Sequence, residues 1–81
     1  MSKFIFDNEN GNILFINPYN PRELCFKRTD SSSSSHVITS ISSKLIDLNT
    51  DDEGELYAMD DDGILYQLRN DSLREVDKLC H

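Results

Sequence analysis

The chain has no tryptophan and one alanine, Ala58, among its 81 residues. Because alanine is the strongest helix former, its near absence argues against a helical bundle. No apolar stretch approaches the length that crosses a membrane. The first residues, Met1–Asp7, lack the extended apolar segment of a signal peptide. We therefore expect a small protein that is not a helical bundle, is cytoplasmic and has no membrane contact.

Basic residues are scarce in the second half of the chain. Residues 1–44 hold four acidic and five basic residues, whereas residues 45–81 hold eleven acidic and three basic ones. No lysine or arginine lies between Lys44 and Arg69. Since phosphate binding needs a basic patch, we expect no direct binding of nucleic acid. The net charge of −7 instead favours another protein with a basic surface as the partner.

The two cysteines, Cys25 and Cys80, lie far apart, which is typical of reduced thiols in the cytoplasm. Together with His36 and His81 they could form a zinc site, but no Cys-x-x-Cys pair supports one. Cys25 with His36 as its base could act as a nucleophile, yet no glycine pair suggests an oxyanion hole. We expect no enzymatic activity and no cofactor.

All three glycines follow an acidic or amide residue and precede a short apolar segment. The pairs are Asn10-Gly11, Glu53-Gly54 and Asp62-Gly63. A glycine in this position supplies the positive φ of a tight hairpin turn. The pattern predicts antiparallel strands joined by acidic turns.

The predicted fold class is mainly β, with six or seven short strands in a small antiparallel meander or barrel-like sheet. Ser72 and Glu75 match a capping box, and Leu73, Val76 and Leu79 recur at helical spacing. We therefore predict a short C-terminal helix over 72–79, in preference to a last strand. The segment 44–48 either continues the strand before it or starts another. The expected strands cover residues 3–7, 12–17, 23–28, 36–41, 44–48, 55–60 and 64–69.

We expect a single domain over residues 1–81. The serine run Ser31–Ser35 lies in a predicted loop, 29–36, between a three-strand unit, 1–28, and a unit of hairpins and the C-terminal segment, 37–81. Several predicted strands carry apolar residues on both faces. Both faces then need cover, from a barrel, a sandwich or another chain. This is the sequence's best indication of an interface, and it makes a homo-oligomer one of the expected states.

Residues 44–68 contain an apolar strand, an acidic turn with Gly54, a strand with Leu56-Tyr57-Ala58, a second acidic turn with Gly63 and a last apolar strand. This succession resembles one blade of a β-propeller, and residues 4–16 resemble a poorer copy of its second half. A closed propeller needs about four blades. The resemblance therefore implies chains that assemble into a ring, with Tyr57 and Tyr66 lining pockets for a small ligand or carbohydrate between blades.

The acidic turns raise two metal hypotheses. Asn49–Asp60 loosely matches an EF-hand loop with Gly54 at position six, although Asp60 replaces the usual glutamate and the flanks lack helical patterning. A calcium-dependent β module is therefore one alternative. The run Asp60–Asp62 could hold Mg²⁺, but no phosphate-binding loop accompanies it. Solvated turns are the simpler interpretation, and we expect no metal.

The leading hypothesis rests on the carboxylates between Asp47 and Asp62. A hairpin would place residues 51–53 and 60–62 at opposite ends of one strand. Carboxylates in a rigid array can imitate a phosphate backbone and occupy a basic surface. The small size and the Asn, Asp, Ser and Ile content suit a phage- or mobile-element-encoded inhibitor of a host protein. The predicted partner-binding residues are Asp51, Asp52, Glu53, Glu55, Tyr57, Met59, Asp60, Asp61, Asp62 and Tyr66.

Overall fold

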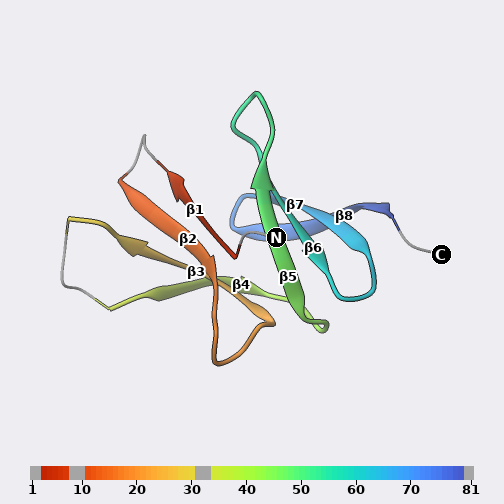
Figure 1. The fold of residues 1–81 in the computed structure, drawn as a ribbon, viewed down its shortest axis with the longest axis horizontal. Helices are drawn as coiled ribbons and strands as arrows, with labels where there is room; N and C mark the ends of the chain where they lie inside the picture. Colours follow the sequence, from red (N-terminus) through yellow and green to blue (C-terminus); the bar gives the residue numbers. More distant parts are fainter. Residues whose placement is uncertain (1–2, 8–10, 31–33, 80–81) are drawn as a thin grey trace.

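The computed structural model describes residues 3–7, 11–30 and 34–79, and these form eight β-strands and no helix (Figure 1). The strands form two antiparallel four-stranded sheets in which neighbours in the chain are neighbours in the sheet. The N-terminal sheet contains β1 (Phe4–Asp7), β2 (Asn12–Ile16), β3 (Glu23–Arg28) and β4 (His36–Ser40). The C-terminal sheet contains β5 (Leu45–Thr50), β6 (Leu56–Asp60), β7 (Ile64–Arg69) and β8 (Ser72–Lys78).

The predicted mainly-β class is confirmed, and the strands follow the expected segments closely. The architecture differs in one respect, since the strands form two packed sheets instead of one barrel-like sheet. β4 follows the serine run but pairs with β3, from Glu23↔Ser40 to Phe26↔His36. The change of sheet therefore comes after β4 and not at the serine run. Of that run, residues 31–33 lie outside the described part of the chain.

The predicted C-terminal helix is wrong, because residues 72–78 form strand β8. Asn70 and Asp71 both have positive φ, 50° and 60°, between the paired residues Arg69 and Ser72. Two such residues make the type I′ turn that returns the chain as a hairpin. The pairing then shifts between Leu65 and Tyr66. A β-bulge at Val76 results. Leu73 packs against the core, whereas Leu79 lines the outer face, so the helical spacing does not correspond to one buried face.

The turn positions predicted from the glycines are confirmed, since all three have positive φ, between 67° and 80°. The order of the strands shows which strand of one sheet corresponds to which strand of the other. Gly11 joins the first two strands of its sheet, as Gly54 does in the other. The segment 4–16 therefore corresponds to the β5–β6 hairpin, and not to the β6–β7 hairpin of residues 56–68. The blade-like segment 44–68 covers β5 to β7, and β8 completes its sheet.

One hydrophobic core holds the two sheets together. Its buried members come from both sheets, with Leu24 fully buried and Leu45 and Leu48 only 1% and 2% exposed. The register of the N-terminal sheet pairs Ile5 with Leu14 and Ile16 with Leu24, so its core residues share one face. Each sheet therefore has an inner face in the core and an outer face turned away from it. The remaining buried members are Ile16, Leu56 and Ala58.

The connection between the sheets, residues 41–44, is hydrogen-bonded to both of them. The N–H of Ile41 donates to the carbonyl of Arg22 at 2.9 Å, and the Arg22 Nε donates to the carbonyl of Ser42 at 3.1 Å. The N–H of Asp61 donates to the carbonyl of Lys44 at 2.8 Å. These contacts fix the connection between the β2–β3 loop and the β6–β7 turn, and so limit rotation of one sheet against the other.

The outer face of the N-terminal sheet is apolar and is exposed at its edge strands β1 and β4, whereas Cys25 in its middle is only 2% exposed. Phe4, Phe15, Cys25 and Val37 are opposite one another on successive strands and form a row across the whole sheet. Phe6 lies beside this row, with its ring edge-on to that of Phe4 at 5.7 Å. The exposed fractions of Phe4, Phe6 and Val37 are 53%, 60% and 54%. This outer face is therefore the surface to which the sequence-based expectation applies, namely that both faces of these strands need cover.

Candidate protein-binding surface

Asp51 and Asp60 begin two turns of the same design. In each, the aspartate Oδ1 accepts the N–H groups two and four residues along, at 2.9 and 3.0 Å after Asp51 and at 3.0 and 2.9 Å after Asp60. Each Oδ2 accepts the tyrosine hydroxyl six residues along, from Tyr57 at 3.2 Å and from Tyr66 at 2.9 Å. The sequence Asp-x-x-Gly-x-Leu-Tyr therefore occurs twice, nine residues apart, and each copy builds a turn and the strand after it.

Asp60 is fully buried and belongs to the framework of the fold. Its carboxylate also accepts the hydroxyl of Ser43, from the connection between the sheets. Burial alone would raise the pKa of Asp60, but the hydrogen bonds from Ser43, Tyr66 and the two backbone N–H groups outweigh burial and lower it. Asp60 therefore stays ionised inside the protein and cannot contact a partner, which corrects its assignment as a partner-binding residue.

Asp51 makes the matching hydrogen bonds at an exposed position. The N–H of Glu55 is the main cause that holds the pKa of Asp51 below its usual value. Burial and the bond to Asp51 together raise the pKa of the Tyr57 hydroxyl. The carboxylate of Asp51 thus shapes the β5–β6 turn while remaining in contact with solvent.

Folding stability should fall as the pH drops below about 4, the ordinary value for an aspartate in an unfolded chain. A lowered pKa in the folded state gives stability that is complete above the unfolded value and is lost as the pH falls through the folded one. We expect Asp60→Asn to show a flatter stability profile than the wild type in urea unfolding between pH 7 and pH 3. Asp61→Asn, at an exposed neighbour, is the control. A profile for Asp60→Asn parallel to that of the wild type would contradict this assignment.

The other predicted acidic residues divide by their role. Asp52 and Glu53 are exposed in the turn before β6, and Asp61 and Asp62 are exposed in the turn after it. A strand the length of β6 separates the two turns, which is roughly 13 Å at 3.3 Å per residue. Glu55 is half-buried and forms an ion pair with Arg69 at 3.4 Å. The expected arrangement of carboxylates at both ends of one strand is therefore present.

Tyr57 and Tyr66 lie on opposite faces of the C-terminal sheet. Tyr57 is opposite Gln67, while Tyr66 is opposite Ala58, which is buried in the core. Tyr66 belongs to the inner face, with its hydroxyl bound to Asp60. The two tyrosines therefore do not share a surface, and Tyr66 is not part of an outer binding surface.

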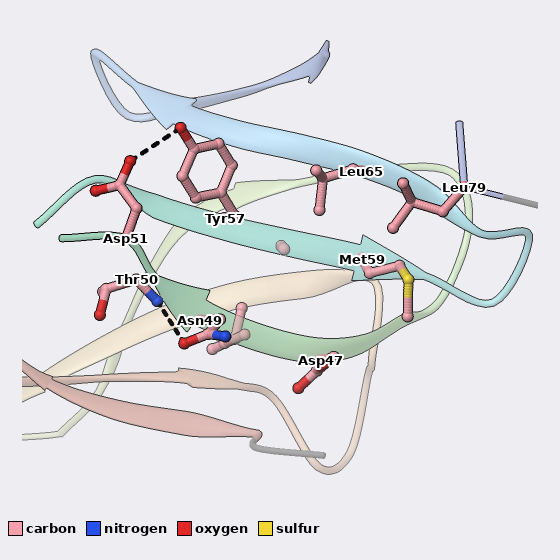
Figure 2. Close-up of a pocket in the computed structure, with 10 residues that line it drawn as sticks. Asp47, Asn49, Thr50, Asp51, Tyr57, Met59, Leu65 and Leu79 are labelled. Atoms are coloured by element: carbon pink, nitrogen blue, oxygen red, sulfur yellow. Dashed lines mark hydrogen bonds between the residues drawn. The ribbon is translucent and has the colours of Figure 1, made fainter. Parts of the chain in front are cut away.

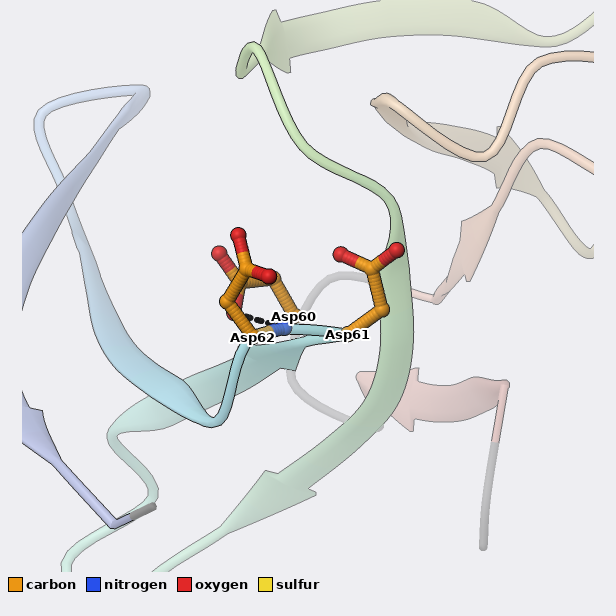
Figure 3. A group of neighbouring side chains, drawn as sticks. All are labelled: Asp60, Asp61 and Asp62. Atoms are coloured by element: carbon orange, nitrogen blue, oxygen red, sulfur yellow. Dashed lines mark hydrogen bonds between the residues drawn. The ribbon is translucent and has the colours of Figure 1, made fainter. Parts of the chain in front are cut away.

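The metal hypotheses meet two structural obstacles. The EF-hand-like segment 49–60 forms a hairpin, which separates Asp51 from Asp60 by the length of β6. The carboxylates of Asp60, Asp61 and Asp62 do lie within 4.8 Å of one another (Figure 3). Both oxygens of Asp60, however, already accept hydrogen bonds from the fold. The acidic group Asp60–Asp62 is therefore a turn in which the carboxylates of Asp61 and Asp62 are exposed.

Cys25 and His36 are not placed as a nucleophile and its base. Cys25 is opposite Val37 on the outer face, while His36 is opposite Phe26 on the next position of the strand pair, and so on the other face. Burial of the thiol, followed by the nearby charge of Glu23, raises the pKa of Cys25. A raised pKa disfavours the reactive thiolate. The other two candidate zinc ligands, Cys80 and His81, lie outside the described residues.

A shallow groove of about 380 Å³ lies on the outer face of the C-terminal sheet (Figure 2). Its lining includes the apolar or aromatic side chains of Tyr57, Met59, Leu65 and Leu79. The N–H of Leu79 donates to the carbonyl of Gly63 at 2.7 Å, which fixes Leu79 beside the β6–β7 turn. The other lining residues are Asp47, Leu48, Asn49, Thr50, Asp51 and Ala58.

The groove combines an apolar floor with acidic residues at its side. Asp47 is opposite Met59 across β5 and β6, and Asp51 holds the Tyr57 ring by its hydroxyl (Figure 2). The groove thus contains three of the ten predicted residues, Asp51, Tyr57 and Met59. The sequence-based hypothesis missed Leu65 and Leu79, and it counted Asp47 in the acidic cluster without choosing it as a partner-binding residue. The repeated Asp-x-x-Gly-x-Leu-Tyr pattern would not have found Leu65, because Leu65 corresponds in it to Leu56, which is buried in the core.

Comparisons with models of known protein families, with curated proteins and with solved structures gave no match. Within the described residues, no helix is long and apolar enough to cross a membrane.

Proposed function

We propose that this protein is a non-enzymatic binding module whose working surface is the acidic, apolar-floored groove on its C-terminal sheet. The partner is a protein surface that carries apolar side chains and positive charge. The single observation behind this proposal is that Tyr57, Met59, Leu65 and Leu79 line one concave patch together with Asp47 and Asp51.

The chemistry of the groove suits a protein better than a small ligand. It is open and shallow, whereas small-molecule sites bury most of the ligand's surface. Interfaces gain their affinity from a few apolar or aromatic anchors, and charges around them select the partner and speed its approach. Tyr57, Met59 and Leu79 can act as the anchors, and the exposed acids of the two neighbouring turns can attract a basic partner.

We further propose a cytoplasmic location. The role of an inhibitor encoded by a phage or mobile element stays a hypothesis that rests on composition and size. The propeller-like ring is the second candidate, because two successive four-stranded meanders match the architecture that the blade resemblance implied.

Substitution of Met59 tests the groove directly. Tagged wild type and Met59→Glu are each incubated in host lysate at low and high salt, and the captured proteins are quantified by mass spectrometry. We expect Met59→Glu to reduce specific capture about tenfold or more, because a carboxylate replaces an apolar anchor. High salt should weaken capture by the wild type through screening of the acidic residues.

Tyr19→Glu is the matched control, since Tyr19 is 95% exposed in the β2–β3 loop and lies away from the groove. It introduces the same charge and should leave capture unchanged. Circular dichroism checks that both variants fold. Capture that survives Met59→Glu undiminished would reject the groove as the binding surface.

A further inference from the structure

We infer that the groove receives the outer face of the N-terminal sheet of a second copy of this chain, so that copies associate head to tail. This inference rests on the proposed function, because it names the partner of the same groove. The following observations carry it: the two open faces, their different chemistry and the way the two sheets already pack within one chain.

The outer face of the N-terminal sheet has the apolar surface that the groove requires of a partner. Its row of Phe4, Phe15, Cys25 and Val37 is apolar across all four strands. Lys27 is opposite Ile13 in the neighbouring row and so lies on the same face. Glu23 lies at the end of this face, where its Oε1 accepts the Asn17 side-chain N–H at 2.8 Å.

The outer face of the C-terminal sheet is more acidic than that of the N-terminal sheet. By register, Asp47, Met59, Leu65 and Asp77 form a row across its four strands, so that two acids flank the apolar pair. Arg74 is the basic residue of the adjacent row, opposite Gln67. Across the whole sequence, residues 45–81 carry eleven acidic and three basic residues, against four and five for residues 1–44. Electrostatic attraction therefore favours contact between unlike sheets over contact between like sheets.

The chain itself shows that unlike sheets pack well, because the inner faces of its N-terminal and C-terminal sheets already share one core. Each chain leaves one open face of each kind. When the N-terminal sheet of one copy contacts the C-terminal sheet of the next, the resulting pair still has one uncovered N-terminal face and one uncovered C-terminal face. Such heterologous contacts continue until a ring closes or a filament forms.

The size of the faces predicts that a single contact is weak. Four strands spaced by about 4.8 Å, each about five residues long, give a face of roughly 19 by 17 Å. The flat area of such a face is about 320 Å², well below the roughly 800 Å² that each partner buries in a standard interface. Ring closure adds a contact without an additional loss of translational freedom, so closed rings should be more stable than open pairs.

The test uses the full chain in sedimentation velocity and light scattering over a wide range of concentration. The wild type should form particles of more than one chain that dissociate on dilution. Phe6→Glu alters the N-terminal outer face and Met59→Glu alters the groove, and each should raise the dissociation constant about 100-fold. Tyr19→Glu should associate as the wild type does. Circular dichroism establishes that every variant is folded, and Phe4→Glu replaces Phe6→Glu if the latter unfolds.

A mixture of Phe6→Glu and Met59→Glu identifies the head-to-tail arrangement. The first variant keeps an intact groove and the second keeps an intact N-terminal face, so the mixture should give a complex of one copy of each. Loss of association in only one of the two variants would show that like faces pair, and would overturn the inference. A wild type that stays monomeric would also overturn it. The proposed function would still stand if Met59→Glu reduced capture of another protein, so the two failures are distinguishable.

Discussion

Asp60→Ala should destabilise the protein by about 3 kcal/mol, since it leaves the hydroxyls of the half-buried Ser43 and Tyr66 and two backbone N–H groups without their common acceptor. For a domain of this size, the melting temperature should fall by roughly 10 to 20 °C. The loss is large because Asp60 is fully buried and joins the β6–β7 turn to the connection between the sheets. Thermal unfolding followed by circular dichroism measures it.

Asp51→Ala is a matched control that the chain itself provides. Asp51 accepts the same set of hydrogen bonds at the equivalent position of the preceding turn, but it is exposed. Water can replace the lost acceptor there, so we expect a clearly smaller effect. Equal losses in the two variants would mean that burial of Asp60 is not what makes it important.

Leu24→Ala should cost about 3 kcal/mol through the lost apolar contacts and the cavity left behind. Leu24 is fully buried in the core that both sheets share. The more informative expectation concerns cooperativity, because the substitution lies in the N-terminal sheet and should lower the stability of the C-terminal sheet equally. Hydrogen exchange of the backbone amides of β6 and β7 measures this directly, at a concentration low enough to exclude association.

Val37→Ala is the control for this prediction. Val37 lies on the outer face of the same sheet and is 54% exposed, so its truncation should change the stability of the monomer by less than about 0.5 kcal/mol. Leu24→Ala could instead open the N-terminal sheet alone and leave the amides of β6 and β7 protected from hydrogen exchange. The two sheets would then be independent units, and the shared core would contribute little to stability.

Most strands were predictable because their cause is local. The glycines at positions 11, 54 and 63 mark turns by conformation, and the apolar segments after them have strand character. The end of the chain was not predictable in the same way. The spacing of Leu73, Val76 and Leu79 fits a helix, and only the three-dimensional structure shows that this segment pairs with β7, with Leu73 and Leu79 on opposite sides of the sheet. Pairing between strands is a property of the fold that the spacing of one segment does not contain.

The candidate site was predictable only in part, for a related reason. The sequence shows that carboxylates gather between Asp47 and Asp62, but it treats them as equivalent. Their hydrogen bonds separate the buried Asp60 from the exposed Asp61 and Asp62. The groove also depends on Leu79, which reaches it through the hydrogen bond to Gly63. Burial and contacts of this kind depend on three-dimensional packing.

The side-chain NMR signals of Met59 and Phe6, recorded as the wild type is diluted, test most directly whether the open faces of the two sheets are the working surfaces. The account predicts that the Met59 methyl and Phe6 ring signals shift together with concentration, while the Tyr19 ring signals stay constant. Constant signals from Met59 and Phe6 across the whole series, or shifts confined to Tyr19, would contradict it.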